Sequence, residues 1–242
     1  MKKKPRPIKY RRIILKLSGE FFGNDGNAFD RSAINYVADQ IIQAKKMGAK
    51  IGVVVGGGNI LRGRDAAWLD KIDADFCGMV GTVINGMVLH SILQEKGQKV
   101  KLSSGFAVEG ITDKFNKFKD LAFYESGGTI LFVGGTGNPL FTTDTAAALR
   151  AAEFHADVLI KGTKVAGVYS ADPEKNKKAI LYNKLTYDQA IQDNLEVMDL
   201  AAFNTCRQAG IPIYVYSFFK NKLCDVISGK TLGTIISGGR ND

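Results

Sequence analysis

The stretch KIGVVVGGG, residues 50–58, carries the main evidence for the fold. Residues 51–55 of this stretch carry no polar side chain, which is typical of a central strand in a parallel sheet with both faces buried. It ends in three consecutive glycines, Gly56 to Gly58, whose backbone amides can approach an anion closely because no Cβ stands in the way. We therefore predict a buried strand that ends in a phosphate-binding loop.

The segments on both sides of this strand alternate between strand and helix patterns. Before it, RRIILKLSGE (residues 11–20) is predicted to be a buried strand, and residues 30–48 a helix that begins after Asp30 and ends at Gly48. After it, strands are predicted at residues 98–102, 127–135, 156–162, 211–219 and 233–237, and helices at 78–97, 112–127, 143–154 and 198–210. This alternation predicts one α/β domain, residues 13–242, with a mostly parallel sheet covered on both faces.

Composition and charge limit the classes of function. The 242-residue chain is 45% hydrophobic, and because no apolar stretch reaches the ~20 residues of a membrane helix, no membrane role is expected. The net charge is +9, but seven of the 33 Lys and Arg residues stand in MKKKPRPIKYRR (residues 1–12), which leaves 26 basic against 24 acidic residues elsewhere. We expect a flexible basic arm at residues 1–12 and no nucleic-acid-binding stripe on the body. Three separated cysteines without a CxxC pair favour reduced thiols in the cytoplasm and no metal site.

Four loops that follow predicted strands carry residues suited to binding phosphates. They are KLSGE (16–20), GGGNILRG (56–63), GGTGNPLFTTD (134–144) and KGTKVAGVYSADP (161–173). The carboxyl ends of parallel strands meet at one edge of a sheet, so the four loops should converge. None fits GxxxxGK[ST] or completes GxGxxG, so neither a P-loop NTPase nor a dinucleotide-binding enzyme is expected.

The charged residues of these loops indicate phosphoryl transfer. Lys16 interrupts a strand of Ile and Leu, so its ammonium group must leave the core or meet an anion. Arg62, four residues after Gly58, can grip phosphate oxygens with two N–H donors. Each feature also has a plain structural explanation: a strand-end lysine, a tight turn or, at Thr143 and Asp144, a helix cap. Together, however, cations and glycine amides without a nucleophile–base pair suit the positioning and charge stabilisation that phosphoryl transfer needs.

Five motifs occur in one order from about residue 13 to the end: LKLSGE, GVVVGGGNILRG, GTGNPLFTTDTAAALRA, KVAGVYSADP and VMDLAAF. With them the chain resembles the bacterial uridylate (UMP) kinases of the amino acid kinase superfamily, for which GTGNPxFTTD and VMDxxA are the more specific motifs. The resemblance implies a three-layer α/β/α sandwich with a mostly parallel central sheet. It also implies transfer of the γ-phosphoryl group of ATP to UMP, with Mg²⁺, to give UDP and ADP in pyrimidine nucleotide biosynthesis, by a cytoplasmic homohexamer.

The resemblance assigns roles to the residues that match these motifs. The catalytic residues would be Lys16, Arg62 and Asp144. The ATP-binding residues would be Lys16, Leu17, Ser18, Gly19, Gly58, Arg62, Thr163, Tyr169 and Asp172. The UMP-binding residues would be Gly57, Asp75, Thr136, Gly137, Asn138, Pro139, Leu140, Phe141, Thr142 and Thr143. Asp75 would accept hydrogen bonds from the ribose hydroxyls.

Two departures from the family pattern and two alternatives stay open. Ala166 stands where the family usually has Asp, and INGMVLHSILQ offers only His90 and Gln94 where members that respond to GTP carry basic residues. The first alternative is another small-molecule kinase of this fold, with a carboxylate or carbamate acceptor. The second is a nucleic-acid-binding or regulatory protein that uses the basic arm.

Overall fold

The chain folds around a nine-stranded sheet, in a computed structural model that describes residues 7–24, 27–61, 66, 68–195 and 197–238. The strand order is β4-β3-β5-β2-β1-β6-β10-β11-β9, and of these neighbours only β10 and β11 run antiparallel. The strands are β1 (Arg12–Leu17), β2 (Lys50–Val55), β3 (Val100–Ser104), β4 (Asp113–Lys114), β5 (Thr129–Val133), β6 (Val158–Thr163), β9 (Lys184–Leu185), β10 (Ile213–Ser217) and β11 (Gly233–Ile236). A separate hairpin pairs β7 (Val168–Tyr169) with β8 (Leu181–Tyr182).

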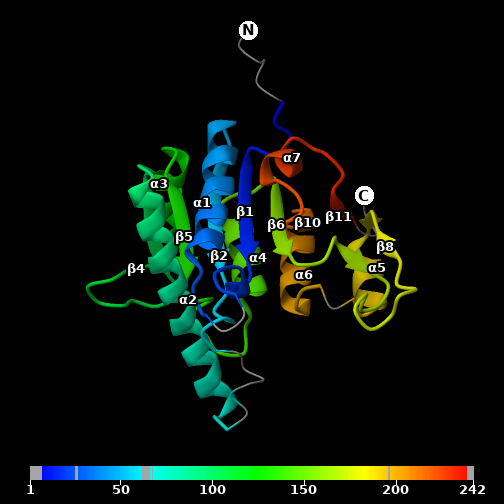
Figure 1. Cartoon of the computed structure of the whole chain (residues 1–242), viewed down its shortest axis with the longest axis horizontal. Helices are drawn as coiled ribbons and strands as arrows, with labels where there is room; N and C mark the ends of the chain where they lie inside the picture. The colour runs from blue at the N-terminus through cyan, green and yellow to red at the C-terminus, as the bar shows by residue number, and fades with distance from the viewer. Residues whose placement is uncertain (1–6, 25–26, 62–65, 67, 196, 239–242) are drawn as a thin grey trace.

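Helices cover both faces of this sheet, so the predicted α/β/α sandwich with a mostly parallel sheet is confirmed (Figure 1). One face carries α1 (Arg31–Lys46), α2 (Lys71–Glu95) and α7 (Leu223–Ile227). The other face carries α3 (Lys117–Glu125), α4 (Thr143–Glu153), α5 (Tyr187–Gln192) and α6 (Leu200–Gln208). A short 3-10 helix, η1 (Gly19–Phe21), follows β1.

Side-chain alternation decides which face of the sheet each residue of β1 and β6 reaches. Ile13, Leu15 and Leu17 pack with α1, α2 and α7, whereas Ile14 packs with α4 and α6. Lys16 therefore lies on the α4 side, because alternate residues of a strand share a face. Lys161 of β6 is the register partner of Lys16. The sheet thus places two lysines side by side near its carboxyl edge.

Helices α2 and α3 begin at least five residues from their predicted starts, whereas α6 begins at Leu200, two residues after its predicted start. Helix α3 begins at Lys117 rather than residue 112, because Asn116 caps it and residues 113–114 pair with β3 instead. Helix α2 begins at Lys71, seven residues before the predicted start, because the side chain of Asp70 caps it there. In both cases a capping side chain sets the helix start, which an apolar pattern alone does not locate.

The folded part of the chain also begins earlier than predicted. The amides of Lys9 and Tyr10 donate to the carbonyl of Ile227 at 2.8 and 3.2 Å, and Tyr10 is buried. Residues 9–12, which the sequence assigns to the basic arm, are therefore attached to α7 and β1. Residues 1–6 of that arm lie outside the described residues.

Helix α2 forms a longer apolar segment than the sequence predicts for any part of the chain. Of the described helices it is the one that is long and apolar enough to cross a membrane, with 25 residues and a mean hydropathy of 1.6 in its most apolar window. Of that window, 44% is buried inside the protein, so length and composition are weak evidence for a membrane span. The helix is apolar because it has a buried apolar face and a second, exposed one, formed by Phe76, Val80, Ile84 and Met87.

Candidate active site

The ends of β1 and β2 bring two predicted loops into direct backbone contact. The Gly56 amide donates to the Leu17 carbonyl at 2.9 Å, which continues the pairing of the two strands beyond their ends. A Cβ on Gly19 would lie 2.7 Å from the Gly56 carbonyl oxygen and 2.8 Å from the Gly58 nitrogen, so glycine is required. Residues 16–19 and the triple glycine therefore form one continuous surface at the carboxyl edge of the sheet, the lower edge in Figure 1.

Asn85 of α2 supports this surface and is not among the residues predicted from the sequence. Its side chain is fully buried, donates to the Gly56 carbonyl at 2.6 Å and exchanges two hydrogen bonds with Asn59, at 2.7 and 3.0 Å. Asn59 also donates to the carbonyl of Ala28 at 2.8 Å. Buried amides nearly always find such partners. The sequence feature that could have indicated this role is an asparagine inside the apolar stretch VINGMV, residues 83–88.

The charged centre of the site is one carboxylate held between two lysines. Lys16 Nζ lies 2.8 Å from Asp144 Oδ1, and Lys161 Nζ lies 2.7 Å from Asp144 Oδ2. All three side chains are largely buried, with exposures between 11% and 14%. Burial would raise the pKa of Asp144, but the two ammonium groups outweigh it and hold that pKa below its ordinary value. This trio of Lys16, Asp144 and Lys161 is net positive.

A second carboxylate, Asp199, anchors the helix that carries Asp144. It caps α6 by accepting from the Ala202 amide at 2.8 Å. It also accepts from the Thr145 hydroxyl at 2.7 Å and from the hydroxyl of Thr142, the residue that caps α4. These bonds tie the start of α6 to the start of α4. Asp199 belongs to the motif VMDLAAF, but no role for it is predicted from the sequence.

The loop of residues 136–143, here called the acceptor loop, is held by Asp75 and by close backbone packing. The Leu140 amide donates to Asp75 Oδ2 at 2.7 Å, so the structure brings two predicted site residues together. Leu140 has a φ of +69°, which a residue with a side chain rarely adopts. At Gly137 a Cβ would lie 2.5 Å from the Gly105 carbonyl oxygen. Leu140 and Phe141 remain 61% and 49% exposed.

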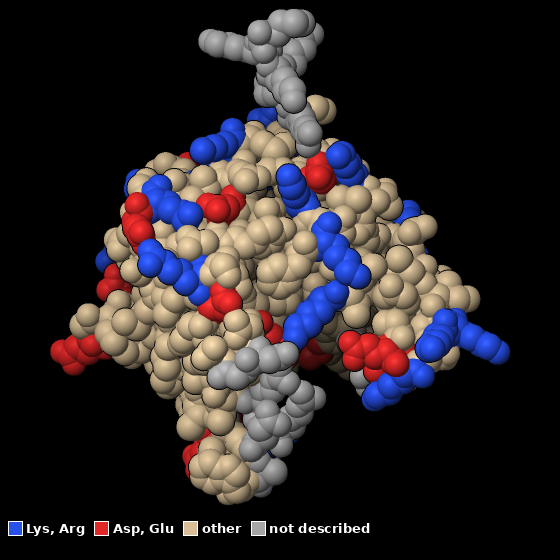
Figure 2. Space-filling view, viewed as in Figure 1, with Lys and Arg blue, Asp and Glu red and all other residues tan. Residues whose placement is uncertain are grey.

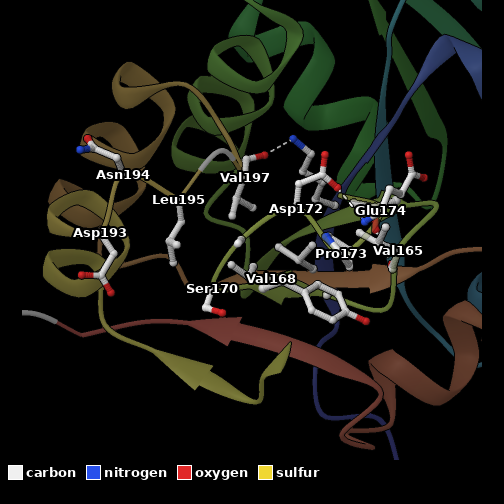
Figure 3. A pocket seen from close by; sticks show the side chains of 16 residues that line it. Val165, Val168, Ser170, Asp172, Pro173, Glu174, Asp193, Asn194, Leu195 and Val197 are labelled. Atoms are coloured by element: carbon white, nitrogen blue, oxygen red, sulfur yellow. Dashed lines mark hydrogen bonds between the residues drawn. The ribbon is translucent and has the colours of Figure 1, made fainter. Parts of the chain in front are cut away.

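A cavity of about 620 Å³ borders the charged centre, because Lys161 lines it (Figure 3). Its walls come from Lys161 and Thr163 of β6 and from the turn that carries Tyr169 and Asp172. The opposite wall is made by residues 193–195 and Val197, between α5 and α6. The three residues predicted for this region thus share one cavity, which is of a size typical for small-molecule ligands. Residues 193–195 carry no motif, and only the fold brings them here.

Two of the predicted cavity residues use their polar groups to shape its walls. The Thr163 hydroxyl donates to the Val165 carbonyl at 2.7 Å. Asp172 accepts from the Glu174 amide at 2.9 Å and so fixes the turn. Both oxygens keep lone pairs with which to accept from a ligand, because hydroxyl and carboxylate oxygens accept more than one bond.

The remaining predicted residues are distributed between these regions. Gly57 packs on α2, where a Cβ would lie 2.5 Å from the Gly78 carbonyl oxygen. Gly57 therefore connects the glycine surface to the helix that carries Asp75. Arg62 lies outside the described residues, so its catalytic role stays a prediction.

The charges near the site do not form a nucleic-acid-binding stripe on the face that Figure 2 shows. A short run of Lys and Arg side chains crosses the middle of this face and ends beside a hollow, where acidic side chains lie as well. Elsewhere on the face the two signs are mixed. A basic stripe, as nucleic-acid-binding proteins use, would be continuous.

Comparisons with known proteins agree over almost the whole chain. The amino acid kinase family model matches residues 11–217. A uridylate kinase from Xanthomonas oryzae is 41% identical over 235 residues, which cover 96% of this chain and 98% of that protein. The crystal structure of a UMP kinase from Bacillus anthracis has a TM-score of 0.91 at 31% identity, covering 96% of this chain and 97% of that one. The UMP kinase from Ureaplasma parvum has a TM-score of 0.88 at 34% identity, covering 94% and 99%.

Proposed function

Because this chain belongs to the amino acid kinase family, we propose that it is a UMP kinase, which transfers the γ-phosphoryl group of ATP to UMP and yields ADP and UDP. The observation that carries this proposal is the position of the net-positive trio. Lys161 lines the cavity, and Asp144 directly follows the acceptor loop, so the trio joins the two regions that would hold the substrates.

Lys16 is the residue placed to stabilise the charge in transfer. An oxygen of the UMP phosphate attacks the γ-phosphorus, and the bond from that phosphorus to the bridging oxygen of ADP breaks. The transition state spreads negative charge over three equatorial oxygens, which an ammonium group and backbone amides can stabilise. A phosphate acceptor is already ionised near neutral pH, so no general base is required. This agrees with a site that holds cations and glycine amides around a carboxylate whose two oxygens both face lysines.

The cavity is the proposed site of the adenosine part of ATP. Tyr169 offers an aromatic ring on its wall, and Asp172 and Thr163 offer oxygen acceptors. Lys161 stands at the end of the cavity that meets the charged centre. ATP bound there would place its phosphates toward Lys16 and the glycine surface.

The acceptor loop and Asp75 are the proposed site of UMP. One oxygen of Asp75 accepts from the Leu140 amide. An ionised carboxylate has about four acceptor positions. Asp75 can therefore hold the loop and accept from the ribose hydroxyls at the same time.

Mg²⁺ enters this proposal as the ion that ATP carries on its phosphates. The described residues contain no group of three or more His, Cys, Asp or Glu side chains placed to hold a metal. Both oxygens of Asp144 also face ammonium groups. Mg²⁺ commonly keeps several waters and binds through substrate phosphates, so no step here depends on a protein ligand to it.

The exposed face of α2 supports the homo-oligomer in the proposal, a homohexamer by family resemblance. Phe76, Val80, Ile84 and Met87 are 39% to 50% exposed and follow each other at spacings of three and four residues, which puts them on one stripe. A second copy of the same stripe would cover it about a two-fold axis. In Val80→Asp we expect the assembly to dissociate in analytical ultracentrifugation, whereas Glu95→Lys, at the polar end of α2, should leave it intact.

We also place the enzyme in the cytoplasm and in pyrimidine nucleotide biosynthesis, since it consumes UMP and produces UDP. Three described or predicted features support a cytoplasmic location: the absence of a disulfide at Cys77, Cys206 and Cys224 within the described chain, the buried part of α2, and nucleotide substrates.

The test of the function is a panel of phosphoryl acceptors. Purified protein with ATP and Mg²⁺ is offered UMP, CMP, acetylglutamate and aspartate, and both ADP release and the phosphorylated product are measured. We expect UDP from UMP at a kcat/KM well above that for the other acceptors. No UDP, with phosphorylation of another acceptor, would establish the carboxylate- or carbamate-kinase alternative. Deletion of residues 1–6, which leaves the buried Tyr10 in place, should not change turnover, whereas a nucleic-acid-binding protein would lose affinity.

A further inference from the structure

Lys161 is the most firmly held cation of the charged centre, and neither its motif nor the resemblance gives it a role. Its ammonium donates to Asp144 Oδ2 at 2.7 Å and to the carbonyl of Val197, the bond that the dashed line at Val197 marks in Figure 3. A lysine has three N–H donors, so two of them are used in these contacts. Lys16 contacts the other oxygen of the same carboxylate, at 2.8 Å.

We propose that Lys161 is a positioning residue for phosphoryl transfer: it occupies one oxygen of Asp144, so that the other oxygen orients the Lys16 ammonium without neutralising it completely. This inference rests on the proposed function. It gives the two lysines different tasks. Lys16 acts on the transferred group, and Lys161 acts through Asp144.

The sheet explains why a second lysine is needed for this arrangement. Lys16 and Lys161 are register partners in parallel strands, and neighbouring strands lie about 4.8 Å apart. Two ammonium groups at such a separation repel each other unless a carboxylate lies between them. If Lys161 carried no charge, both oxygens of Asp144 could turn to Lys16. The Lys16 ammonium would then be held as an ordinary ion pair, with fewer donors directed to phosphate oxygens.

The second contact of Lys161 connects the charged centre to the cavity wall. Val197 lines the cavity and follows residues 193–195, which line it as well. Its carbonyl accepts from the same ammonium that holds Asp144. The wall of the proposed ATP site and the carboxylate that orients Lys16 are therefore fixed by one side chain.

The pH dependence of turnover distinguishes this role from a structural one. Within the described chain, the charged and titratable groups around Asp144 are Lys16 of β1, Lys161 of β6, Asp199, which caps α6, and Cys206 of α6. Burial raises the pKa of Asp144, and the two lysines lower it. With Lys161 replaced by a neutral residue, one of the lowering charges is lost and the pKa of Asp144 rises. Because orientation of Lys16 requires ionised Asp144, turnover should then fail at a higher pH on the acid side.

The experiment compares Lys161→Met, which removes the charge and keeps the length, with Lys161→Arg, which keeps the charge. Lys50→Met is the matched control, because Lys50 also forms a strand ion pair, with Glu125, but at the opposite end of the sheet. We expect Lys161→Met to lose about 10²-fold in kcat, the scale of a small misplacement of a reacting group, and its acid limb to move up by at least one pH unit. Lys161→Arg should keep the wild-type acid limb, and Lys50→Met should keep both properties.

Each outcome of this comparison is decisive. A wild-type kcat and acid limb in Lys161→Met would overturn the positioning role, even if thermal melting shows lower stability. If Lys161→Met does not fold, Lys161→Gln is used, since its amide can still donate to Val197 while it carries no charge, and the same shift of the acid limb is expected. If the wild-type protein itself makes no UDP from UMP, the proposed function fails instead, and the two failures are thereby separated.

Discussion

The two halves of the site are built differently. The donor half, the cavity with the trio of Lys16, Asp144 and Lys161, is made of strand ends and helix starts whose charged side chains are largely buried. The acceptor half is a loop with two exposed apolar residues, Leu140 and Phe141, that Asp75 holds through one backbone amide. The donor half is thus part of the core, whereas the acceptor half lies at the surface and is held by Asp75, by the packing of Gly137 on Gly105 and by the bond of Thr142 to Asp199. Changes to the first should therefore lower turnover, and changes to the second should weaken UMP binding.

The largest expected effect tests the donor half. Lys16→Ala removes the ammonium proposed to stabilise the transferred group, an interaction that is stronger in the transition state than in the ground state. We expect kcat to fall by about 10²–10³-fold, as on removal of one oxyanion donor, with smaller changes in KM. Steady-state kinetics and a thermal melt check this. Near-normal turnover, or a loss that follows unfolding alone, would mean that the donor half only holds a nucleotide.

The next effect tests the acceptor half. Asp75→Asn removes the charge from the group that holds Leu140 and, in our proposal, the ribose. A hydrogen bond to a charged group contributes roughly 1.5–3 kcal/mol, so kcat/KM for UMP should fall about ten- to hundredfold while the KM for ATP stays the same. Asp73→Asn, an exposed carboxylate two residues away on α2, is the matched control. Equal losses for both substrates would remove Asp75 from the acceptor half.

A third prediction tests whether the donor half depends on the core. Asn85→Ala leaves the Gly56 carbonyl and the Asn59 side chain without their buried partner. The free energy of unfolding, measured in urea, should fall by about 1–3 kcal/mol, and turnover should fall with it. Asn35→Ala, an amide at the surface of α1, should stay within about 0.5 kcal/mol. An unchanged stability in Asn85→Ala would show that the glycine surface does not need its support.

The smallest effect concerns the strain in the acceptor loop. Leu140 has a φ of +69°, which glycine adopts without cost. In Leu140→Gly the relief of strain and the added freedom of the unfolded chain oppose each other, so stability should change by less than about 1 kcal/mol. Leu140→Val, whose branched side chain fits this conformation worse, should be the less stable of the two. Both should alter the KM for UMP and leave that for ATP unchanged; a change in ATP binding alone would contradict the division into halves.

Much of the fold could be predicted because its signals are local. Strands with both faces apolar, such as residues 50–55, indicate a parallel sheet, and glycines or charges at their ends indicate where a site forms. The predicted residues Lys16 and Asp144 meet in the structure for this reason. The starts of α2 and α3 were predicted wrongly because single caps, Asp70 and Asn116, decided them.

The rest of the site depends on contacts between distant parts of the chain. Lys161 becomes part of it only through the register of β6 with β1, and Asp199 only through the packing of α6 on α4. Residues 193–195 line the cavity because the connection between the short helices α5 and α6 runs along its wall. Asn85, unlike these residues, has a local signal in the sequence. An amide in an apolar helix predicts a buried polar partner, but it does not identify that partner.

Helix α2 has a consequence for how an assembly and its chemistry are linked. Its 25 residues form a rod of about 37 Å, at 1.5 Å per residue. Along it lie Asp75 at the acceptor loop, Asn85 under the glycine surface and the exposed stripe from Phe76 to Met87. These groups are fixed at different angles around the helix axis. If α2 rotated to fit a second copy of the chain, all of them would move together. A rotation of α2 about its own axis would therefore change both the contact between two copies of the chain and the position of Asp75 at the acceptor ribose.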